Sequence, residues 1–280
     1  MITALSVKIP ERRRGVRGWA QRLRGDRVEV QTKEARGVTL RHVVYTSYSG
    51  ELRLEKTFRA VGSGCGSLLC SERLIFPRAS GYRRFSSTAF SARLCANFAL
   101  AALSRCQSAA SLRIGIYDPA AVCADLLYPL LERCNDVAVV TAAAAPYLCE
   151  AQRALEEMGA AALVTKSRSA LEDRDLIIAP QRVEEPLALH EAVLLTAAKP
   201  DRETGGVQLY RYRFRMPNGF DQIKPRELSE EYFCSALYTL GAQYALGSIV
   251  PLSAGGNRAE YTPEQLAKWL DKRKQKEYNN

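Results

Sequence analysis

The sequence predicts an α/β protein built around a parallel sheet, and three observations lead to this prediction. Between residues 111 and 200, short uncharged runs rich in Val, Ile and Leu alternate with stretches of helical periodicity. Strands that are buried on both faces have continuous apolar runs, and helices between them allow parallel pairing. The chain has 280 residues, near the length at which one core divides into several packing units. We therefore expect a parallel sheet in 111–200, after an N-terminal α+β segment (1–110) and before a C-terminal strand with helices (201–280) that packs on the rest.

The N-terminal segment is predicted to be strongly basic. Residues 1–110 hold 20 Lys and Arg against 7 Asp and Glu, which exceeds the whole net charge of +10. Arginines crowd residues 11–27, which we expect to form a basic arm or a short surface helix. Such asymmetry is typical of a surface for an acidic partner or nucleic acid, and also of a solvated face. Alternating or β-branched runs predict antiparallel strands at 27–32, 38–45 and 51–58, then a strand at 68–76 and a helix at 90–103.

The middle segment is predicted to form five parallel strands in the order 3-2-1-4-5. Helices are expected at about 118–134 and 146–158, with Gly159 as the stop of the second. Pro129 is expected to kink or locally break the first helix, because proline removes an amide and crowds the carbonyl four residues earlier. The strands are predicted at 112–117, 137–141, 162–165, 176–179 and 192–196.

The C-terminal segment begins with a two-faced strand at 207–216. Its aromatic residues alternate with Arg211, Arg213 and Arg215, which we expect on a solvated or partner-binding face. Ser229 is expected to cap a helix that runs to about residue 246, and Thr262 with Gln265 forms a capping-box pattern for the last helix. Residues 272–280 are predicted to be frayed.

Composition predicts a cytoplasmic protein with no membrane association, no secretion signal and no metal site. No stretch approaches the roughly 20 apolar residues of a membrane span. The closest cysteine pair, Cys65 and Cys70, lies apart in sequence from the other cysteines and from His42 and His190, so ligand spacing typical of zinc is missing. The eight cysteines are expected to be reduced, with five acting as small buried residues: Cys95, Cys106, Cys123, Cys134 and Cys149.

Residues 113–123 resemble the first strand, turn and helix start of Rossmann-type dehydrogenases. Residues 175–180 are similar to the fourth strand of the glutamyl-tRNA reductase and shikimate dehydrogenase type of NAD(P)-binding domain, and residues 192–196 to its fifth. The resemblance is at superfamily level and covers about a third of the chain. It implies a Rossmann-like domain with a ligand site at the carboxyl ends of the strands.

The glycine fingerprint of those dehydrogenases is missing. Asp118, Ala120 and Cys123 stand where three glycines allow the tight turn, the approach of the pyrophosphate and close helix packing. Asp118 also brings a carboxylate to the place where a helix N-terminus should receive an anion. Residues 141–145 replace the acidic residue that would bind the ribose. NAD(P) is therefore a disfavoured cofactor, and the cofactor remains unknown.

Asp118 has two interpretations. It can be the N-cap of a helix that begins at Pro119, or a catalytic group at the carboxyl edge of the first strand. The capping interpretation is preferred because it requires only local sequence. The candidate ligand-binding residues, all expected at this edge, are Tyr117, Asp118, Pro119, Ala120, Thr141, Ala179, Pro180, Gln181 and Thr196.

The glycine-rich stretch 62–67 has the composition of a phosphate-binding loop, but it lacks the Lys-Ser/Thr ending and a following helix, so we expect a hairpin loop. Together these features predict a Rossmann-like protein with an altered nucleotide site that serves in small-molecule binding, regulation or structure. The alternatives are an NAD(P)-dependent oxidoreductase with atypical cofactor binding, and nucleic-acid binding through the basic residues 1–110. The oligomeric state is open.

Overall fold

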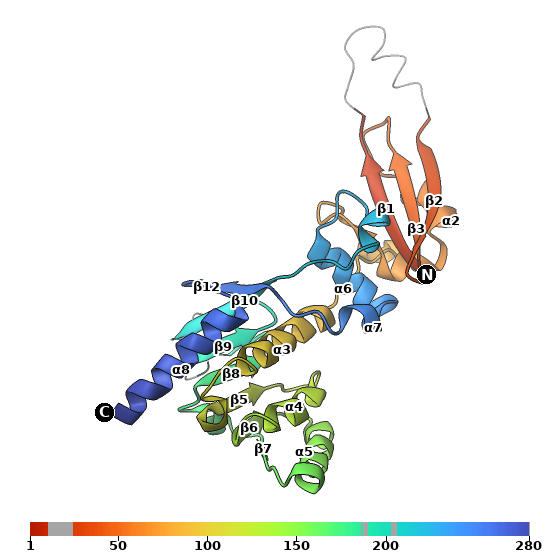
Figure 1. Ribbon diagram of the computed structural model, residues 1–280. Coiled ribbons are helices and arrows are strands. Elements are labelled where there is room, and N and C mark those ends of the chain that lie inside the picture. The colour runs from red at the N-terminus through yellow and green to blue at the C-terminus, as the bar shows by residue number, and fades with distance from the viewer. Residues whose placement is uncertain (11–24, 186, 188–189, 203–205, 280) are drawn as a thin grey trace. The chain divides into compact units, whose positions relative to one another are not determined.

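The computed structural model describes residues 1–10, 25–185, 187, 190–202 and 206–279 (Figure 1). The chain forms two compact units, one of Met1–Ser87 with Met216–Leu246 and one of Thr88–Arg215 with Gly247–Asn280. The predicted segments 1–110, 111–200 and 201–280 do not coincide with these units. The reason is that helix α3 (Ala89–Leu103) and strand β10 (Val207–Arg213), which flank the middle segment, pack within the second unit. The predicted basic arm falls mostly at residues 11–24, outside the described residues.

The first unit contains a four-stranded sheet in the order β2-β3-β1-β4. Strands β2 (Arg27–Ala35) and β3 (Val38–Thr46) form the predicted antiparallel hairpin, and β1 (Ile2–Lys8) lies parallel to both β3 and β4 (Leu69–Cys70). The hairpin turns through Arg36 and Gly37, both with positive φ (49° and 74°), the conformation of a tight hairpin turn. The strand predicted at 68–76 is much shorter in the structure, where it is the two-residue strand β4.

The predicted strand at 51–58 is wrong, because this region forms helix α2 (Leu54–Val61). Thr57 and Val61 are its buried residues, and Leu54 is half-buried, which is the spacing of one helix face. The stretch Gly62–Ser67 is a short 3₁₀ helix that leads toward β4, not a hairpin loop. A Cβ at Gly64 would lie 2.3 Å from Thr3 Oγ1, so glycine here permits close approach to β1.

The remaining helices of the first unit are α6 (Glu230–Leu240) and α7 (Gln243–Leu246). The predicted cap is confirmed, since Ser229 Oγ accepts a hydrogen bond from Tyr232 N at 3.3 Å. The single helix expected up to residue 246 is interrupted after Leu240, where the chain turns at Gly241.

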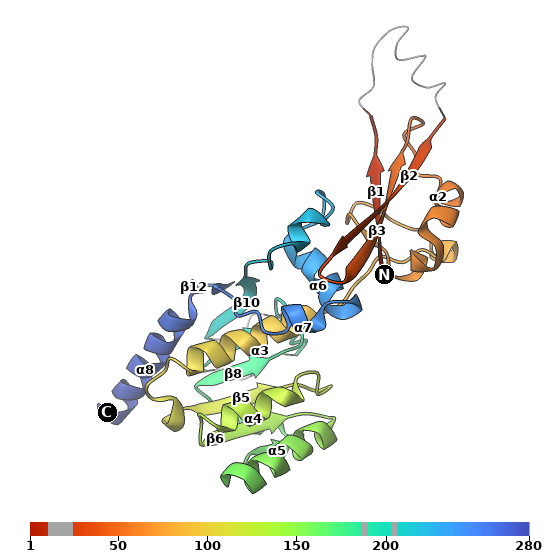
Figure 2. The same ribbon diagram turned by 45° about the vertical axis from the view of Figure 1, so that its right-hand side comes forward.

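The second unit contains an eight-stranded sheet in the order β12-β11-β10-β9-β8-β5-β6-β7. The five predicted strands form a parallel sheet in the predicted order 3-2-1-4-5, which confirms the Rossmann-like fold (Figure 2). Strand β10 adds a sixth parallel strand beside β9, which completes the doubly wound order 3-2-1-4-5-6. A short antiparallel hairpin of β11 (Ser253–Gly256) and β12 (Glu260–Tyr261) extends the sheet. The parallel strands are β5 (Arg113–Tyr117), β6 (Asp136–Val140), β7 (Leu163–Thr165), β8 (Leu176–Ala179) and β9 (Val193–Thr196).

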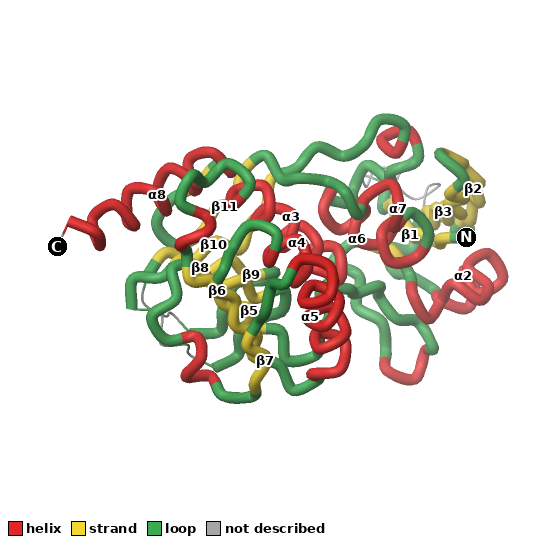
Figure 3. The backbone as a smooth tube through the Cα atoms, turned by 60° about the horizontal axis from the view of Figure 1, so that its bottom comes forward, coloured by secondary structure: helices red, strands yellow, loops and turns green. Residues whose placement is uncertain are grey.

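Helices cover this sheet unevenly. Helix α3 packs against β8, β9 and β10, while α4 (Leu127–Leu131) and α5 (Ala144–Met158) pack on each other beside β6 and β7 (Figure 3). Another apolar cluster joins Ile177 and Leu194 of the sheet to Leu171, Val183 and Leu187, which come from 3₁₀ and loop segments. Irregular segments therefore take the place of helices over part of the sheet.

The first predicted helix of this unit is much shorter than expected. Residues 118–123 form turns, and helical structure is limited to a 3₁₀ turn (Ala124–Leu126) followed by α4. Pro129 is the third residue of α4, where its missing amide would have no intrahelical partner. Helix α5 ends as predicted at Gly159, which has a left-handed φ of 68°.

The C-terminal helix α8 (Pro263–Asn279) includes residues 272–279 of the segment predicted to be frayed. Its capping box is confirmed, since Thr262 N donates to Gln265 Oε1 (2.9 Å) and Gln265 N donates to Thr262 Oγ1 (3.3 Å). Two side chains hold the helix beyond its first turns. Lys274 Nζ lies 3.1 Å from the buried Asp175 carboxylate, and Asp271 Oδ1 accepts from Ser108 N at 2.8 Å. These tertiary contacts order an end that is polar in sequence.

Strand β10 has the predicted two faces. Tyr212 packs on Phe98 of α3, with ring centroids 5.9 Å apart, whereas Arg211 and Arg213 are exposed.

Of the five cysteines expected to be buried, four are buried and Cys149 is exposed on α5; each of the eight cysteines is a free thiol. Within the described residues, no helix is both long and apolar enough to cross a membrane, and no group of three potential metal ligands is found.

We expect Gly256→Ala to destabilise the second unit strongly. A Cβ at Gly256 would lie 1.5 Å from the Gln208 carbonyl oxygen, so β11 would have to move away from β10. Overpacking of this kind costs about 1–3 kcal/mol or more. Urea unfolding measures the loss. The matched control is Gly255→Ala, whose Cβ would meet no other atom closer than 3.9 Å; equal loss in both variants would contradict the packing argument.

Candidate functional site

The nine candidate residues are brought together at one edge of the second sheet. Tyr117, Ala179 and Thr196 end the parallel strands β5, β8 and β9, and Thr141 follows the last residue of β6. The strand order reverses between β5 and β8, which is the position where open α/β sheets bind their ligands. The candidate residues thus meet at one edge of the sheet, as expected, while their use as a ligand site stays a prediction.

The side chain of Asp118 is completely buried at this edge and accepts four hydrogen bonds. Its Oδ1 accepts from Val122 N (3.1 Å) and Gln181 Nε2 (2.8 Å), and its Oδ2 accepts from Cys123 N (2.9 Å) and the Tyr147 hydroxyl (2.8 Å). A buried carboxylate is costly unless such donors replace water. Here two backbone amides and two side chains supply them.

This arrangement corrects the capping interpretation. An N-cap side chain binds the amides two or three residues later, whereas Asp118 binds the amides four and five residues later. No helix begins at Pro119, because its carbonyl accepts from Ala142 N at 3.1 Å and so ties the turn to the segment after β6. Ala121 has a positive φ of 53°, which bends the turn back over the carboxylate.

The neighbouring candidate side chains are also engaged within the protein. Thr196 Oγ1 donates to Gln181 O at 2.8 Å, and Thr141 Oγ1 accepts from Ala143 N at 3.1 Å. Tyr147 was not predicted from the sequence as a residue of this edge, because its only signal is a position near the start of a predicted helix. Burial raises the pKa of Tyr147, and Asp118 raises it further, so the hydroxyl keeps the proton that it donates.

The edge therefore already holds an anion of its own. Two consecutive amides, which in a glycine-rich turn would face a phosphate, face the Asp118 carboxylate. Because that carboxylate has no exposed surface, direct proton transfer to a substrate is not open to it in this conformation. The geometry favours a structural role for Asp118 over a catalytic one.

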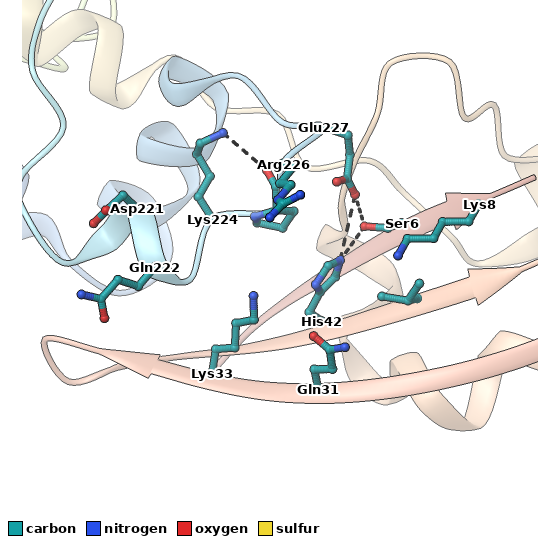
Figure 4. Close-up of a pocket in the computed structure, with 12 residues that line it drawn as sticks. Ser6, Lys8, Gln31, Lys33, His42, Asp221, Gln222, Lys224, Arg226 and Glu227 are labelled. Carbon is teal, nitrogen blue, oxygen red and sulfur yellow. Dashed lines mark hydrogen bonds and ion pairs between the residues drawn. The ribbon is translucent and has the colours of Figure 1, made fainter.

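A second candidate site, which the sequence did not reveal, lies in the first unit. Strand alternation places Ser6 and Lys8 of β1, His42 of β3, and Gln31 and Lys33 of β2 around one cavity of about 450 Å³. Figure 4 shows residues 221–227 lying over this face of the sheet. We call this space the basic cavity; the covering segment contributes Asp221, Gln222, Lys224, Pro225, Arg226 and Glu227.

Ser6, His42 and Glu227 meet at one wall of the basic cavity. The Ser6 hydroxyl lies 2.5 Å from His42 Nε2 and donates to Glu227 Oε1, which is 4.0 Å from the same ring nitrogen (Figure 4). A Ser-His-acid nucleophile requires the acid on Nδ1 and the serine on Nε2. Here both partners lie at Nε2, and the buried Nδ1 has no partner among the described residues. This arrangement suits ligand binding rather than nucleophilic catalysis.

The basic cavity is lined by more cations than carboxylates. Lys8, Lys33, Lys224 and Arg226 have no carboxylate ion-pair partner in the part of the chain that the structure describes. Lys224 Nζ donates to Leu228 O at 2.7 Å, which holds its side chain in place. Burial lowers the pKa of His42; Glu227 opposes the shift, while Lys33 and Lys8 add to it. The imidazole is therefore neutral at pH 7.

Comparisons with solved structures find distant likenesses. No family model and no curated protein matches the sequence. One similar solved structure is Thermococcus litoralis Δ1-pyrroline-2-carboxylate reductase in complex with NADH and L-proline, with 16% identity over 72% of this chain and 70% of that chain, and a TM-score of 0.31. Another is L-tryptophan dehydrogenase from Nostoc punctiforme, with 10% identity over 99% of this chain and 89% of that chain, and a TM-score of 0.31. The assignment of a Rossmann-like fold rests on the strand order.

We expect Asp118→Asn to be destabilising, unlike a substitution at an ordinary N-cap, where asparagine is well tolerated. An asparagine offers one acceptor oxygen, so its amide group must face either Val122 N or Cys123 N and leave that donor unpaired. A buried unpaired donor costs about 1–3 kcal/mol. Denaturant unfolding measures the change.

The control for this variant is Asp125→Asn. Asp125 is half exposed and pairs with Arg93 at 2.7 Å, so its loss should cost no more than about 1 kcal/mol. If Asp118→Asn costs no more than this control, the four hydrogen bonds do not hold the turn.

We expect His42 to make stability depend on pH. Because the folded-state pKa of His42 lies below 6.5, the unfolded chain binds a proton that the folded chain does not as pH falls through 6.5. The contribution of His42 is thus full above pH 6.5 and declines below it. Urea midpoints at pH 7.5 and 5.5 should differ less in His42→Gln than in the parent. His190→Gln, at an exposed residue, is the control and should keep the parental difference.

Proposed function

We propose that this chain is a small-molecule-binding protein with a regulatory or structural role, in which the Rossmann-like sheet is a scaffold rather than a dinucleotide site. The observation that carries the proposal is the buried Asp118 carboxylate, which occupies the two amides of the turn at the strand switch point. A protein that binds NAD(P) in the ordinary way leaves these amides for the pyrophosphate.

Energetics support this proposal. A pyrophosphate entering the turn would have to displace Asp118, and it would then replace the carboxylate at the two amides. The hydrogen bonds from Tyr147 and Gln181 to the carboxylate would still be lost. At ~1.5 kcal/mol for each bond to a charged group, the loss is about 3 kcal/mol, or roughly a hundredfold in affinity. Repulsion between the carboxylate and the phosphates adds to this cost.

The second candidate is an NAD(P)-dependent oxidoreductase that binds its cofactor in an atypical way. The six-strand order favours it, since this order is typical of dinucleotide-binding domains. The sequences of β8 and β9 resemble strands of the glutamyl-tRNA reductase and shikimate dehydrogenase type of domain, and this resemblance also supports the oxidoreductase. The cofactor would then lie along Asp118–Ala120, Thr141, Ala179–Gln181 and Thr196. A third candidate, nucleic-acid binding, is supported by the charge of residues 1–110.

Titration calorimetry with NAD⁺, NADH, NADP⁺ and NADPH separates the first two candidates. We expect no saturable binding at about 1 mM ligand, because the turn is closed by Asp118. One-to-one binding of any of the four that is weakened in Gln181→Ala and unchanged in the matched surface variant Gln152→Ala would overturn the proposal and favour the oxidoreductase. Gln181 contacts Asp118, whereas Gln152 is an exposed residue of α5.

A further inference from the structure

We propose that the basic cavity of the first unit binds a small phosphomonoester that also carries hydroxyl groups, such as a phosphorylated sugar. Lys8, Lys33 and Arg226 would receive the phosphate, and Ser6, His42 and Glu227 would receive the hydroxyls. This site lies in the unit without the Rossmann-like sheet, so it goes beyond the function proposed above and does not depend on the state of Asp118.

Charge balance favours a phosphomonoester over a monocarboxylate. The cavity is lined by four cationic side chains and by two carboxylates, Asp221 and Glu227, which leaves an excess of two positive charges beside a neutral His42. A phosphomonoester carries about −1.5 to −2 at pH 7 and offers three acceptor oxygens. It therefore neutralises the excess, whereas a monocarboxylate leaves one cation uncompensated.

Two of the cations lie near His42. Lys8 and Lys33 are both close enough to influence His42, although they come from strands on opposite sides of β3. Figure 4 shows Lys33 extending toward the His42 ring from one side and Lys8 lying on the other side, with Arg226 above the ring, whereas Lys224 points away from it. Lysine and arginine are the usual phosphate ligands, and a concave site strengthens their attraction for an anion.

The acceptors at the wall point to hydroxyl groups on the same ligand. The buried Nδ1 of His42 has no partner among the described residues, and a neutral imidazole accepts through an unprotonated nitrogen. With Nε2–H directed to Ser6, and Ser6 donating to Glu227, the lone pair lies on Nδ1. Nδ1 itself is buried, so the acceptor that a ligand can reach at this wall is the Glu227 carboxylate, whose side chain is 38% exposed. A carboxylate accepts from a ligand hydroxyl and repels an anionic oxygen.

The size of the cavity agrees with such a molecule. Its volume is about 450 Å³, and small-molecule sites commonly measure ~300–1,000 Å³. Inorganic phosphate alone would leave most of this space to water. The ring or chain that carries the hydroxyls would fill the space between the cations and the wall formed by Ser6, His42 and Glu227.

The test is titration calorimetry of the full chain with ribose 5-phosphate, inorganic phosphate and ribose. We expect one saturable site for ribose 5-phosphate, binding at least tenfold weaker for inorganic phosphate, and none for ribose. Equal affinity for phosphate and its ester would overturn the assignment of the hydroxyl wall, and no saturable binding of the ester at 10 mM would overturn the site.

Matched variants locate the binding. Lys33→Gln should weaken ribose 5-phosphate binding at least tenfold, while Arg59→Gln, an exposed cation of α2 in the same unit, should change it less than twofold. Equal weakening in both variants would show that only the net charge of the protein matters, and it would overturn the proposal.

A single-stranded oligonucleotide that binds more tightly than the ester, with the same dependence on Lys33, would overturn the proposal in favour of nucleic acid. Dinucleotide binding that survives Lys33→Gln would instead count against the function proposed for the Rossmann-like sheet.

Discussion

The buried carboxylate of Asp118 joins the parts of the switch point that the sheet alone does not hold. One oxygen binds the turn after β5 and the side chain of Gln181 after β8, and the other binds the same turn and Tyr147 of α5. Segments separated by 29 and 63 residues along the chain thereby share one acceptor. Charged hydrogen bonds in a water-free setting are strong and directional. The conformation of the carboxyl edge, and therefore its availability to ligands, depends on this group.

The parallel sheet could be predicted because its physical cause is local. Strands buried on both faces need uncharged residues throughout, and the runs of β5, β6, β8 and β9 carry that pattern in the chain itself. Helix α2 could not be recognised in the same way, since its short alternating run fits a strand as well as a helix. The order of α8 depends on partners elsewhere, Asp175 and Ser108, which no local pattern shows.

The meeting of the candidate residues at one sheet edge could be predicted, but the contacts of their side chains could not. Asp118 was singled out by its position after the first strand, yet two of its four donors, Tyr147 and Gln181, are distant in sequence. The basic cavity is a stronger case, because His42 and Glu227 meet only after the chain returns from the second unit. The two sites treat charge in opposite ways. One satisfies a buried anion with internal donors, and the other keeps an excess of cations over carboxylates.

The two outermost strands of the eight-stranded sheet limit how the protein can associate with itself. At one end lies β7 with three residues, and at the other lies β12 with two. An exposed edge offers unpaired backbone amides and carbonyls in proportion to its length, and long flat edges recruit strands from other chains. Edges this short offer almost no template. The second unit is thus protected against growth of its sheet into continuous intermolecular sheets, whereas the four-stranded sheet of the first unit ends in the nine-residue strand β2.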